Sequence, residues 1–334
     1  AVTQENLEET VTYKPLGNLV PKPEKPNDPN FPSTPEVKYP NDPTDPTKPG
    51  KPVVPNVPGY EPHLPDPNDP TKPGQPIQPG TPVTPDKPGE DTPIIYVPKT
   101  NDVTQPTKQT VTFEGAGSTT PKDDVQSDYT FTGKKNQADG TTTWTENSHT
   151  YGRESVPVVS GYYADKSEAG RKTVTPGNPN AEDVVTYKPL GKIIQVDEDG
   201  NVIPNSTSVT YNNNPSNPKE AAETKIPDAP TGYVIKEEQP QAWGYNIVDK
   251  TIEPNDESDP DRISRDTPII YVPIVNDVTK PTKQTVKFEG AGDKTPADNF
   301  QDDFTFTGKV NKADGSTTWT EKSHTYGKVS VPVI

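Results

Sequence analysis

The stretch Asn101-Asp102-Val103-Thr104-Gln105-Pro106-Thr107-Lys108-Gln109-Thr110-Val111 begins again at Asn276, 175 residues later, with one substitution. Trp144 returns at the same spacing as Trp319. A period this long exceeds the roughly 20–50 residues of solenoid and propeller repeats. The repeat therefore indicates tandem copies of a whole module or of a module pair, an arrangement that adds reach and avidity.

Strand patterns fill the repeated segment. Two stretches, at 110–113 and 129–132, alternate polar and apolar residues, and two more candidate strands follow at 141–145 and 184–187. Such alternation predicts sheets with one buried face and one wet face. Pro157 marks Val156–Val158 as an edge strand, because proline cannot donate a ladder hydrogen bond.

The segment that follows adds strands and one candidate helical turn. Ile193–Val196 and Asn201–Ile203 flank Asp199-Gly200, a strong signal for a two-residue hairpin turn. Lys219–Glu223 follows Pro218 and predicts one turn of helix. Two further strands are expected, at 233–235 and 269–272.

Proline is concentrated near the start of the chain, where 26 of the 45 prolines fall between residues 14 and 98. Proline at every third position favours polyproline II and interrupts β ladders, which predicts a stiff, extended spacer. The spacing of Tyr39 and Pro43 nevertheless returns in Tyr211 and Pro215, within a segment that contains strand patterns. The residues leave two alternatives open, a folded module with long proline-rich loops or a mainly extended spacer.

Charge and composition exclude several classes of partner. With 49 Asp and Glu against 33 Lys and Arg, the net charge is −16, which repels nucleic acid and anionic lipid. No apolar run approaches the roughly 18 residues of a membrane span, so neither nucleic-acid binding nor membrane insertion is expected.

The absence of Cys excludes disulfides and Cys-based metal sites. Without Met and without a signal segment, the chain is expected to be a piece of a longer protein.

Catalytic and metal-binding patterns are missing from the sequence or are better explained as turns. No HExxH, GxSxG or phosphate-loop motif occurs, and Glu146-x-x-His149 lies in an extended, Thr-rich context. Asp197-x-Asp199-Gly200-Asn201 resembles part of a calcium loop but lacks its distal Glu, and a hairpin turn explains it better. We therefore expect no enzyme, no catalytic residue, no metal and no cofactor.

One group of aromatic residues is a candidate ligand-binding site. It consists of Trp144, His149 and Tyr151, which return as Trp319, His324 and Tyr326. On one interpretation these rings form a stacking platform for sugars, whose C–H faces pack on aromatic rings. On the other, Trp144 fills a small core and Tyr151 caps it, as large aromatic side chains commonly do.

Three longer phrases carry a family resemblance. They are Tyr129-Thr130-Phe131-Thr132-Gly133, Val158-Val159-Ser160-Gly161-Tyr162-Tyr163-Ala164-Asp165-Lys166 and Val185-Thr186-Tyr187-Lys188-Pro189-Leu190-Gly191. These phrases resemble the repeats of mucus-binding adhesins of lactic acid bacteria. Leu190–Ile194, with the closing Thr267–Val272, is similar to the companion mucin-binding module, so the resemblance covers nearly the whole chain.

The resemblance implies a fold and a division of the chain. The fold is mainly β or α+β, with tandem small β-grasp (ubiquitin-like) modules in an elongated array. Residues 1–17 would be the tail of a preceding truncated repeat, and 18–98 a proline-rich mucin-binding-type module with long loops. Residues 99–187 would be a β-rich mucus-binding repeat, 188–273 a second mucin-binding-type module, and 274–334 a truncated second copy of the repeat.

The resemblance also implies a function. The chain would be the repeat region of a Gram-positive cell-surface adhesin, anchored to the cell wall in its full-length parent. Its modules would bind host mucin glycoprotein or its glycans, weakly one by one and by avidity together. Two alternatives stay open: a structural stalk that presents a distant adhesive domain, and a module that binds immunoglobulin or another host glycoprotein through its β edges.

Overall fold

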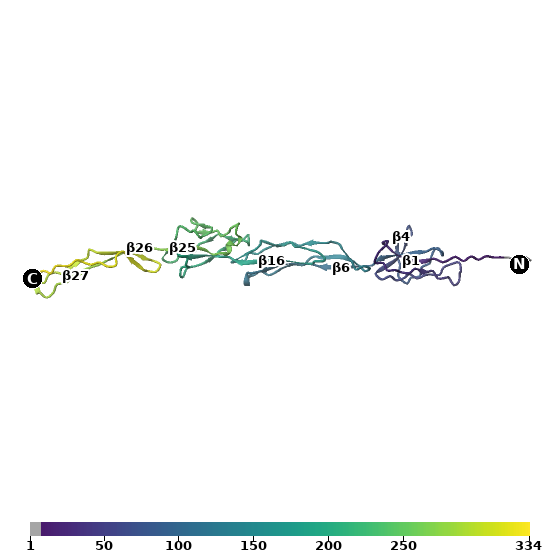
Figure 1. Ribbon diagram of the computed structural model, residues 1–334, viewed down its shortest axis with the longest axis horizontal. Coiled ribbons are helices and arrows are strands. Elements are labelled where there is room, and N and C mark those ends of the chain that lie inside the picture. The colour runs from purple at the N-terminus through teal and green to yellow at the C-terminus, as the bar shows by residue number, and fades with distance from the viewer. Residues whose placement is uncertain (1–7) are drawn as a thin grey trace, which may run out of the picture. The chain divides into compact units, whose positions relative to one another are not determined.

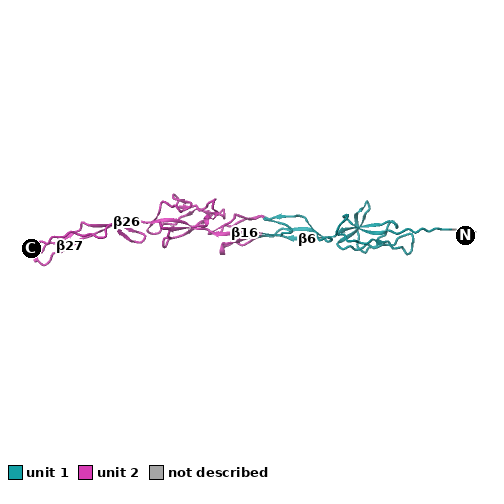
Figure 2. Ribbon diagram, viewed as in Figure 1, with its two compact units in different colours: residues 1–109, 125–151, 172–181 teal, residues 110–124, 152–171, 182–334 magenta. Residues whose placement is uncertain are grey.

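The computed structural model describes residues 8–334, and the chain divides into two compact units (Figure 2). The first unit holds the residues up to Gln109 together with 125–151 and 172–181, and the second holds 110–124, 152–171 and 182–334. The boundary passes through the segment 99–187. The division into five modules therefore stays a prediction.

Strands make up the regular structure of the chain. Within residues 8–334 the helical elements are three short 3-10 helices, Gly117–Thr119, Pro260–Ser264 and Gly292–Lys294. The expectation of a mainly β protein is confirmed. The described residues contain no α-helix, so they do not form the α+β alternative. Frequent proline disfavours helices, and threonine and valine in the periodic segments favour strands.

The first unit begins with a five-stranded sheet in the order β2-β1-β5-β3-β4, of which β1 and β4 are labelled in Figure 1. Its strands are β1 (Asn18–Pro23), β2 (Val37–Lys38), β3 (Tyr60–Asp66), β4 (Asp69–Pro76) and β5 (Thr92–Pro98). β1 and β5 are parallel, and the other pairs are antiparallel. Leu19, Val54, Tyr60, Ile94 and Tyr96 are buried together as its core. The alternative of an extended spacer is therefore wrong, because apolar residues between the prolines supply a core.

Aspartate side chains fold the proline-rich loops into turns. Asp42 accepts hydrogen bonds from the backbone N–H and the hydroxyl of Thr44, and Asp45 does the same for Thr47. Such turns use the short carboxylate in place of a backbone acceptor. β4 contains three prolines and still pairs with β3, but through register shifts around Pro65.

The rest of the first unit is a second β structure. β6 (Thr100–Pro106), β9 (Thr130–Asn136) and β10 (Thr142–Trp144) form the antiparallel sheet β10-β9-β6, and β11 (His149–Thr150) pairs with β15 (Thr173–Val174). Phe131, Tyr151 and Val174 are buried together in this part. Three strands have residues in both units: β7 (Lys108–Glu114), β8 (Asp124–Gln126) and β16 (Asn180–Pro189).

β7, β8 and β16 belong to a four-stranded sheet in the order β13-β16-β7-β8, where β13 is Tyr162–Ala164. β12 (Arg153–Ser155) pairs with β14 (Glu168–Gly170). The edge strand predicted at Val156–Val158 is wrong. Val156 is buried in the core of this sheet, and the Pro157 carbonyl accepts a hydrogen bond from the Tyr187 hydroxyl at 2.7 Å. Packing and a single backbone hydrogen bond, from the Val156 N–H to the Ser167 carbonyl at 3.1 Å, hold the segment.

The next sheet has the order β18-β17-β25-β22, from β17 (Lys192–Val196), β18 (Val209–Thr210), β22 (Tyr233–Ile235) and β25 (Thr267–Pro273). Its strand order and its parallel central pair match β2-β1-β5-β3 of the first unit. The hairpin after β17 is wider than predicted. Val196 pairs with Val202, and the Asp197 carboxylate accepts the N–H groups of Asp199 and Asn201 inside the turn.

Short strands complete this part of the second unit. β19 (Asn212–Asn213) pairs with β20 (Ala221–Ala222), and β21 (Thr224–Lys225), β24 (Thr251–Ile252) and β23 (Tyr245–Asn246) pair in the order β21-β24-β23. The helical turn predicted at Lys219–Glu223 is wrong. The Asn255 side chain bonds both the N–H and the carbonyl of Ala221 and holds it in β20. This tertiary contact overrides a weak local signal.

The last strands repeat those of the first unit. β26 (Val275–Pro281), β29 (Thr305–Asn311) and β30 (Thr317–Trp319) form the sheet β26-β29-β30, and β27 (Gln284–Val286) pairs with β28 (Asn299–Gln301). In the segment expected to be a repeat tail, residues 8–17 form no strand. Residues 1–7 of that segment lie outside the described residues.

A glycine turn joins neighbouring sheets in the same way within each unit. The Gly59 carbonyl (φ +81°) accepts the Lys99 N–H at 2.8 Å, and the Gly232 carbonyl (φ +86°) accepts the Ile274 N–H at 2.8 Å. In the second case Lys312, from the turn between β29 and β30, donates its N–H to the Ile274 carbonyl. We call these two contacts the glycine joints.

Candidate functional site

The candidate aromatic residues of the first unit lie in one row of packed rings. His149 stacks on Tyr129, with centroids 3.7 Å apart and planes at 4°, and its edge meets Tyr151 at 5.0 Å. Phe131 packs edge-on against Tyr129 at 5.0 Å and against Trp144 at 6.4 Å. The structure therefore brings all three predicted residues of this copy together, with Tyr129 and Phe131 between them.

Burial separates the three predicted residues. Tyr151 is 4% exposed, and its hydroxyl shares a 2.7 Å hydrogen bond with Thr107, so its ring belongs to the core. Trp144 is half-buried over Gly133, where an added Cβ would lie 2.9 Å from its Cε3 atom. His149 is half-buried, with one ring face covered by Tyr129. Only Trp144 and His149 keep part of their rings open to a ligand.

The second unit repeats this row. His324 stacks on Phe304 at 3.7 Å, and the Tyr326 hydroxyl shares a 2.5 Å hydrogen bond with Thr282. His324 is exposed, while Tyr326 and Trp319 are half-buried. The second row is thus more accessible than the first, although its ring geometry is the same.

The two rows differ at one hydroxyl. The Tyr129 hydroxyl donates a hydrogen bond to Glu146, which raises the pKa of Tyr129. Phe304 stands at the corresponding place and has no hydroxyl to donate. Glu146 therefore binds a neighbouring ring, and it forms no helical Glu-x-x-His pair with His149.

A second surface, which sequence reasoning missed, lies on one face of the sheet β10-β9-β6. Side chains from all three strands line a shallow groove of about 680 Å³. We call it the threonine face, and its main residues are Thr100, Asp102, Thr104, Thr132, Lys134, Asn136, Thr143 and Thr145. In the sequence, the only sign of this face was the Thr-x-Thr alternation within single strands. Strand register is needed to show that these side chains share one face.

The threonine face occurs again on the sheet β26-β29-β30. Its residues stand 175 positions later and are Asp277, Thr279, Thr307, Lys309, Asn311, Thr318 and Thr320. The register is the same, since Asp277 pairs with Lys309 as Asp102 pairs with Lys134. Each unit therefore carries one polar face of nearly identical composition.

Each threonine face carries one exposed ion pair. Lys134 donates to Asp102, and Lys309 to Asp277, both at 2.8 Å. This hydrogen bond lowers the pKa of each aspartate below its usual value. Exposed pairs contribute little to stability, so the lysines stay available to a ligand. With hydroxyl, amide, ammonium and carboxylate groups side by side, the face can bind sugar hydroxyls and a single anionic substituent.

Metal binding finds no support in the part of the chain that the structure describes. Residues 8–334 contain no group of three His, Asp or Glu side chains placed to hold a metal ion. Asp197, the first residue of the calcium-like stretch, uses its carboxylate for the turn, and the backbone N–H of Asn201 lowers its pKa. Among the same residues, no helix is long and apolar enough to cross a membrane.

Comparison with known families identifies one part of the chain. Residues 98–191 match the family model described as the Muc B2-like domain. The matched span contains the first threonine face and the first aromatic row. No curated protein matches the chain.

Three solved structures are similar to parts of the chain. A MucBP domain from Lactobacillus acidophilus is 27% identical over 27% of this chain and 97% of its own, with a TM-score of 0.22. The type 2 repeat of the mucus binding protein MUB from Lactobacillus reuteri is 17% identical over 39% of this chain and 76% of its own, with a TM-score of 0.23. The mucin-binding domain of Spr1345 from Streptococcus pneumoniae is 18% identical over 28% of this chain and 97% of its own, with a TM-score of 0.23.

Proposed function

We propose that the chain acts as the mucin-binding repeat region of a bacterial surface adhesin, and the match of residues 98–191 to the Muc B2-like domain supports this. Its ligand is mucin glycoprotein, bound weakly by each repeat. The observation that carries the proposal is the threonine face, present once in each unit with the same register and ion pair. The domains to which the chain is similar are mucin-binding domains rather than enzymes, and nothing in the comparisons supports an immunoglobulin partner.

The threonine face supplies the contacts that an acidic adhesin needs for an often acidic glycan. A net charge of −16 rules out bulk attraction to sialate or sulfate groups. Lys134 instead offers one local ammonium, while threonine hydroxyls and Asn136 bond the neutral sugar hydroxyls. The aromatic candidates lie on the other side of the sheet, where Trp144 and His149 keep part of their rings open as a separate surface for the C–H faces of sugars. Tyr151 holds the sheet through Thr107. Their counterparts Trp319, His324 and Tyr326 have the same roles.

The modules are β-grasp-like, with loops and short strands in place of the helix that packs on such sheets. The shared strand order with a parallel central pair supports this assignment for 18–98 and 188–273. Residues 99–187 and 274–334 are the two copies of the repeat, and residues 1–17 the tail of another. The parent protein is anchored to the cell wall of a Gram-positive bacterium.

Loss of the two face lysines tests the function. The double variant Lys134→Gln/Lys309→Gln should bind immobilised mucin about fivefold more weakly through each face and about 25-fold more weakly where both faces bind, since a charge-assisted hydrogen bond contributes about 1 kcal/mol or more. The matched control is Lys48→Gln/Lys236→Gln, which removes two lysines from exposed ion pairs outside the faces. Equal affinities of the two double variants would contradict the proposal.

A spacer is the second candidate function. The glycine joints favour it, because they fix neighbouring sheets to each other within each unit. If the unaltered chain does not bind mucin at all, the result contradicts the adhesin function and supports the spacer function.

A further inference from the structure

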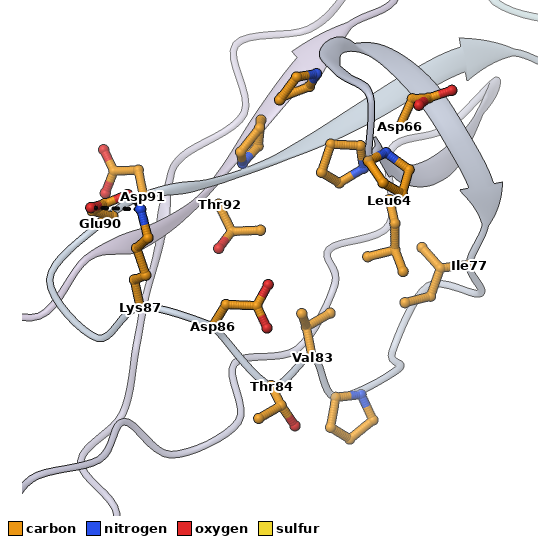
Figure 3. A pocket seen from close by; sticks show the side chains of 15 residues that line it. Leu64, Asp66, Ile77, Val83, Thr84, Asp86, Lys87, Glu90, Asp91 and Thr92 are labelled. Carbon is orange, nitrogen blue, oxygen red and sulfur yellow. Dashed lines mark hydrogen bonds and ion pairs between the residues drawn. The ribbon is translucent and has the colours of Figure 1, made fainter.

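A proline-lined groove in the first unit lies outside the threonine face (Figure 3). The β3–β4 hairpin forms one side and the segment 77–93 forms the other, around a volume of about 590 Å³. Five prolines contribute to the lining, namely Pro65, Pro67, Pro70, Pro82 and Pro93. Their rings are rigid and their nitrogens donate no hydrogen bond, so the walls hold their shape and are mainly apolar.

The floor of the groove is continuous with the core of the module. Leu64, Ile77 and Val83 are half-buried and pack against that core. Backbone hydrogen bonds fix two of them, from the Ile77 N–H to Pro62 and from the Val83 N–H to Pro52, both at 2.9 Å. The groove is therefore preformed, as sites for small apolar groups usually are.

The rim of the groove is acidic. Its carboxylates are Asp66, Asp86, Glu90 and Asp91. Lys87 is the one cation of the lining, and its Nζ lies 3.0 Å from Glu90. Asp66 and Asp91 accept backbone N–H groups. Asp86 has no hydrogen bond or ion pair to the described residues, and its carboxylate points into the groove in Figure 3.

We propose that this groove binds a basic peptide segment of a partner protein. The aliphatic stem of a lysine or arginine lies on the floor formed by Leu64, Ile77 and Val83, and its cationic head meets Asp86. Long basic side chains commonly divide in this way, with an apolar stem and a charged tip. The same carboxylates repel sialylated or sulfated glycans. The groove thus has a different ligand from the threonine face and does not depend on the function proposed for that face.

Titration of the full chain with a fluorescent hexapeptide of alternating lysine and leucine tests the proposal. Anisotropy should show saturable binding, and acetylation of the lysines should weaken it about fivefold or more, because it removes the charge. Asp86→Asn should weaken binding about fivefold as well. Glu36→Gln is the control, since it removes an exposed carboxylate from the same module outside the groove and should leave the affinity unchanged.

Val83→Thr separates groove binding from diffuse attraction to an acidic chain. It keeps the side-chain shape but makes the floor polar, and it should weaken peptide binding without changing the charge. Lys134→Gln/Lys309→Gln should leave peptide binding intact. The proposal is overturned if the acetylated peptide binds equally well, if Asp86→Asn and Glu36→Gln have the same affinity, or if a sialylated oligosaccharide displaces the peptide.

Discussion

Two glycines determine where the tryptophans of the repeats lie. Gly133 pairs with Trp144, and Gly308 with Trp319. A Cβ at Gly133 would lie 2.7 Å from the Thr143 carbonyl oxygen and 2.9 Å from the ring of Trp144. The missing side chain therefore lets the ring cover the strand on the side opposite the neighbouring threonines, because alternate residues point to opposite faces.

Gly133→Ala should displace Trp144 and lower the free energy of unfolding by about 1–3 kcal/mol, the usual cost of overpacking. Urea unfolding followed by tryptophan fluorescence would measure the change. Gly177→Ala is the control, because Gly177 has no positive φ and no atom within 4 Å of an added Cβ. If both substitutions have the same effect, steric closeness at Gly133 is not the cause.

Two buried phenols should make the first module sensitive to base. Burial raises the pKa of Tyr96 from 10.0 to about 12, and burial with a hydrogen bond to Asp28 raises that of Tyr60 to about 12. Folding favours the neutral phenols, so their contribution to stability is complete below pH 10 and is lost between pH 10 and 12. Tyrosinate absorbance should rise together with loss of structure in this window.

Tyr60→Phe should make stability less dependent on pH between 10 and 12, because one of the two ionising groups is gone. The matched control is Tyr13→Phe, since Tyr13 is 87% exposed. Stepwise ionisation of all tyrosines with the far-UV circular dichroism unchanged would show that the phenols are not coupled to folding.

Among the structural elements, the glycine joints tolerate little change at their glycines. At Gly232 a Cβ would lie 2.4 Å from the Lys312 carbonyl oxygen, and at Gly59 it would lie 3.0 Å from Ala138. Both glycines also have positive φ, which strains any other residue. The joints therefore depend on glycine both for backbone conformation and for space.

Gly232→Ala should open its joint while the sheet beside it stays folded. Hydrogen exchange should speed up at the amides of Ile274 and Lys312, and the amide of Ile269, in the buried strand β25, should keep its protection. Gly315→Ala is the matched control, because its φ is also positive, at +73°, but nothing lies within 4 Å of the added Cβ. Similar exchange in both variants would attribute the effect to backbone strain alone.

Local sequence patterns predicted many of the strands. Contacts between residues far apart in the sequence determine the conformation of the other segments. Thr110–Phe113 and Ile269–Val272 lie within β7 and β25, as their patterns indicate. Ala221 follows a helix-like sequence but is drawn into a strand by Asn255, which is 34 residues away. The threonine face required the register of three strands, which no single segment encodes. The aromatic row was visible as a group of residues, whereas the burial of Tyr151 depends on Thr107.

Across the whole molecule, repetition of the threonine face matters more than any single contact. Each net hydrogen bond of an exposed group contributes only about 0.5–1.5 kcal/mol, so one shallow groove holds a glycan weakly. Mucin displays many glycans, and the second face on the same chain then binds at an effective concentration set by the link between the two. Retention should therefore depend on both faces and on the density of the ligand.

Dissociation from mucin layers of different density tests this dependence. On a dense layer, Lys134→Gln and Lys309→Gln should each dissociate about fivefold faster than the unaltered chain, because each weakens one of two faces that bind together. On a sparse layer, where only one face finds a glycan, each single variant should dissociate at nearly the rate of the unaltered chain. Lys236→Gln removes a lysine from an exposed ion pair outside the faces and should behave as the unaltered chain at both densities. Rates that do not change with density, or single variants as slow as the unaltered chain on the dense layer, would mean that the two faces act independently.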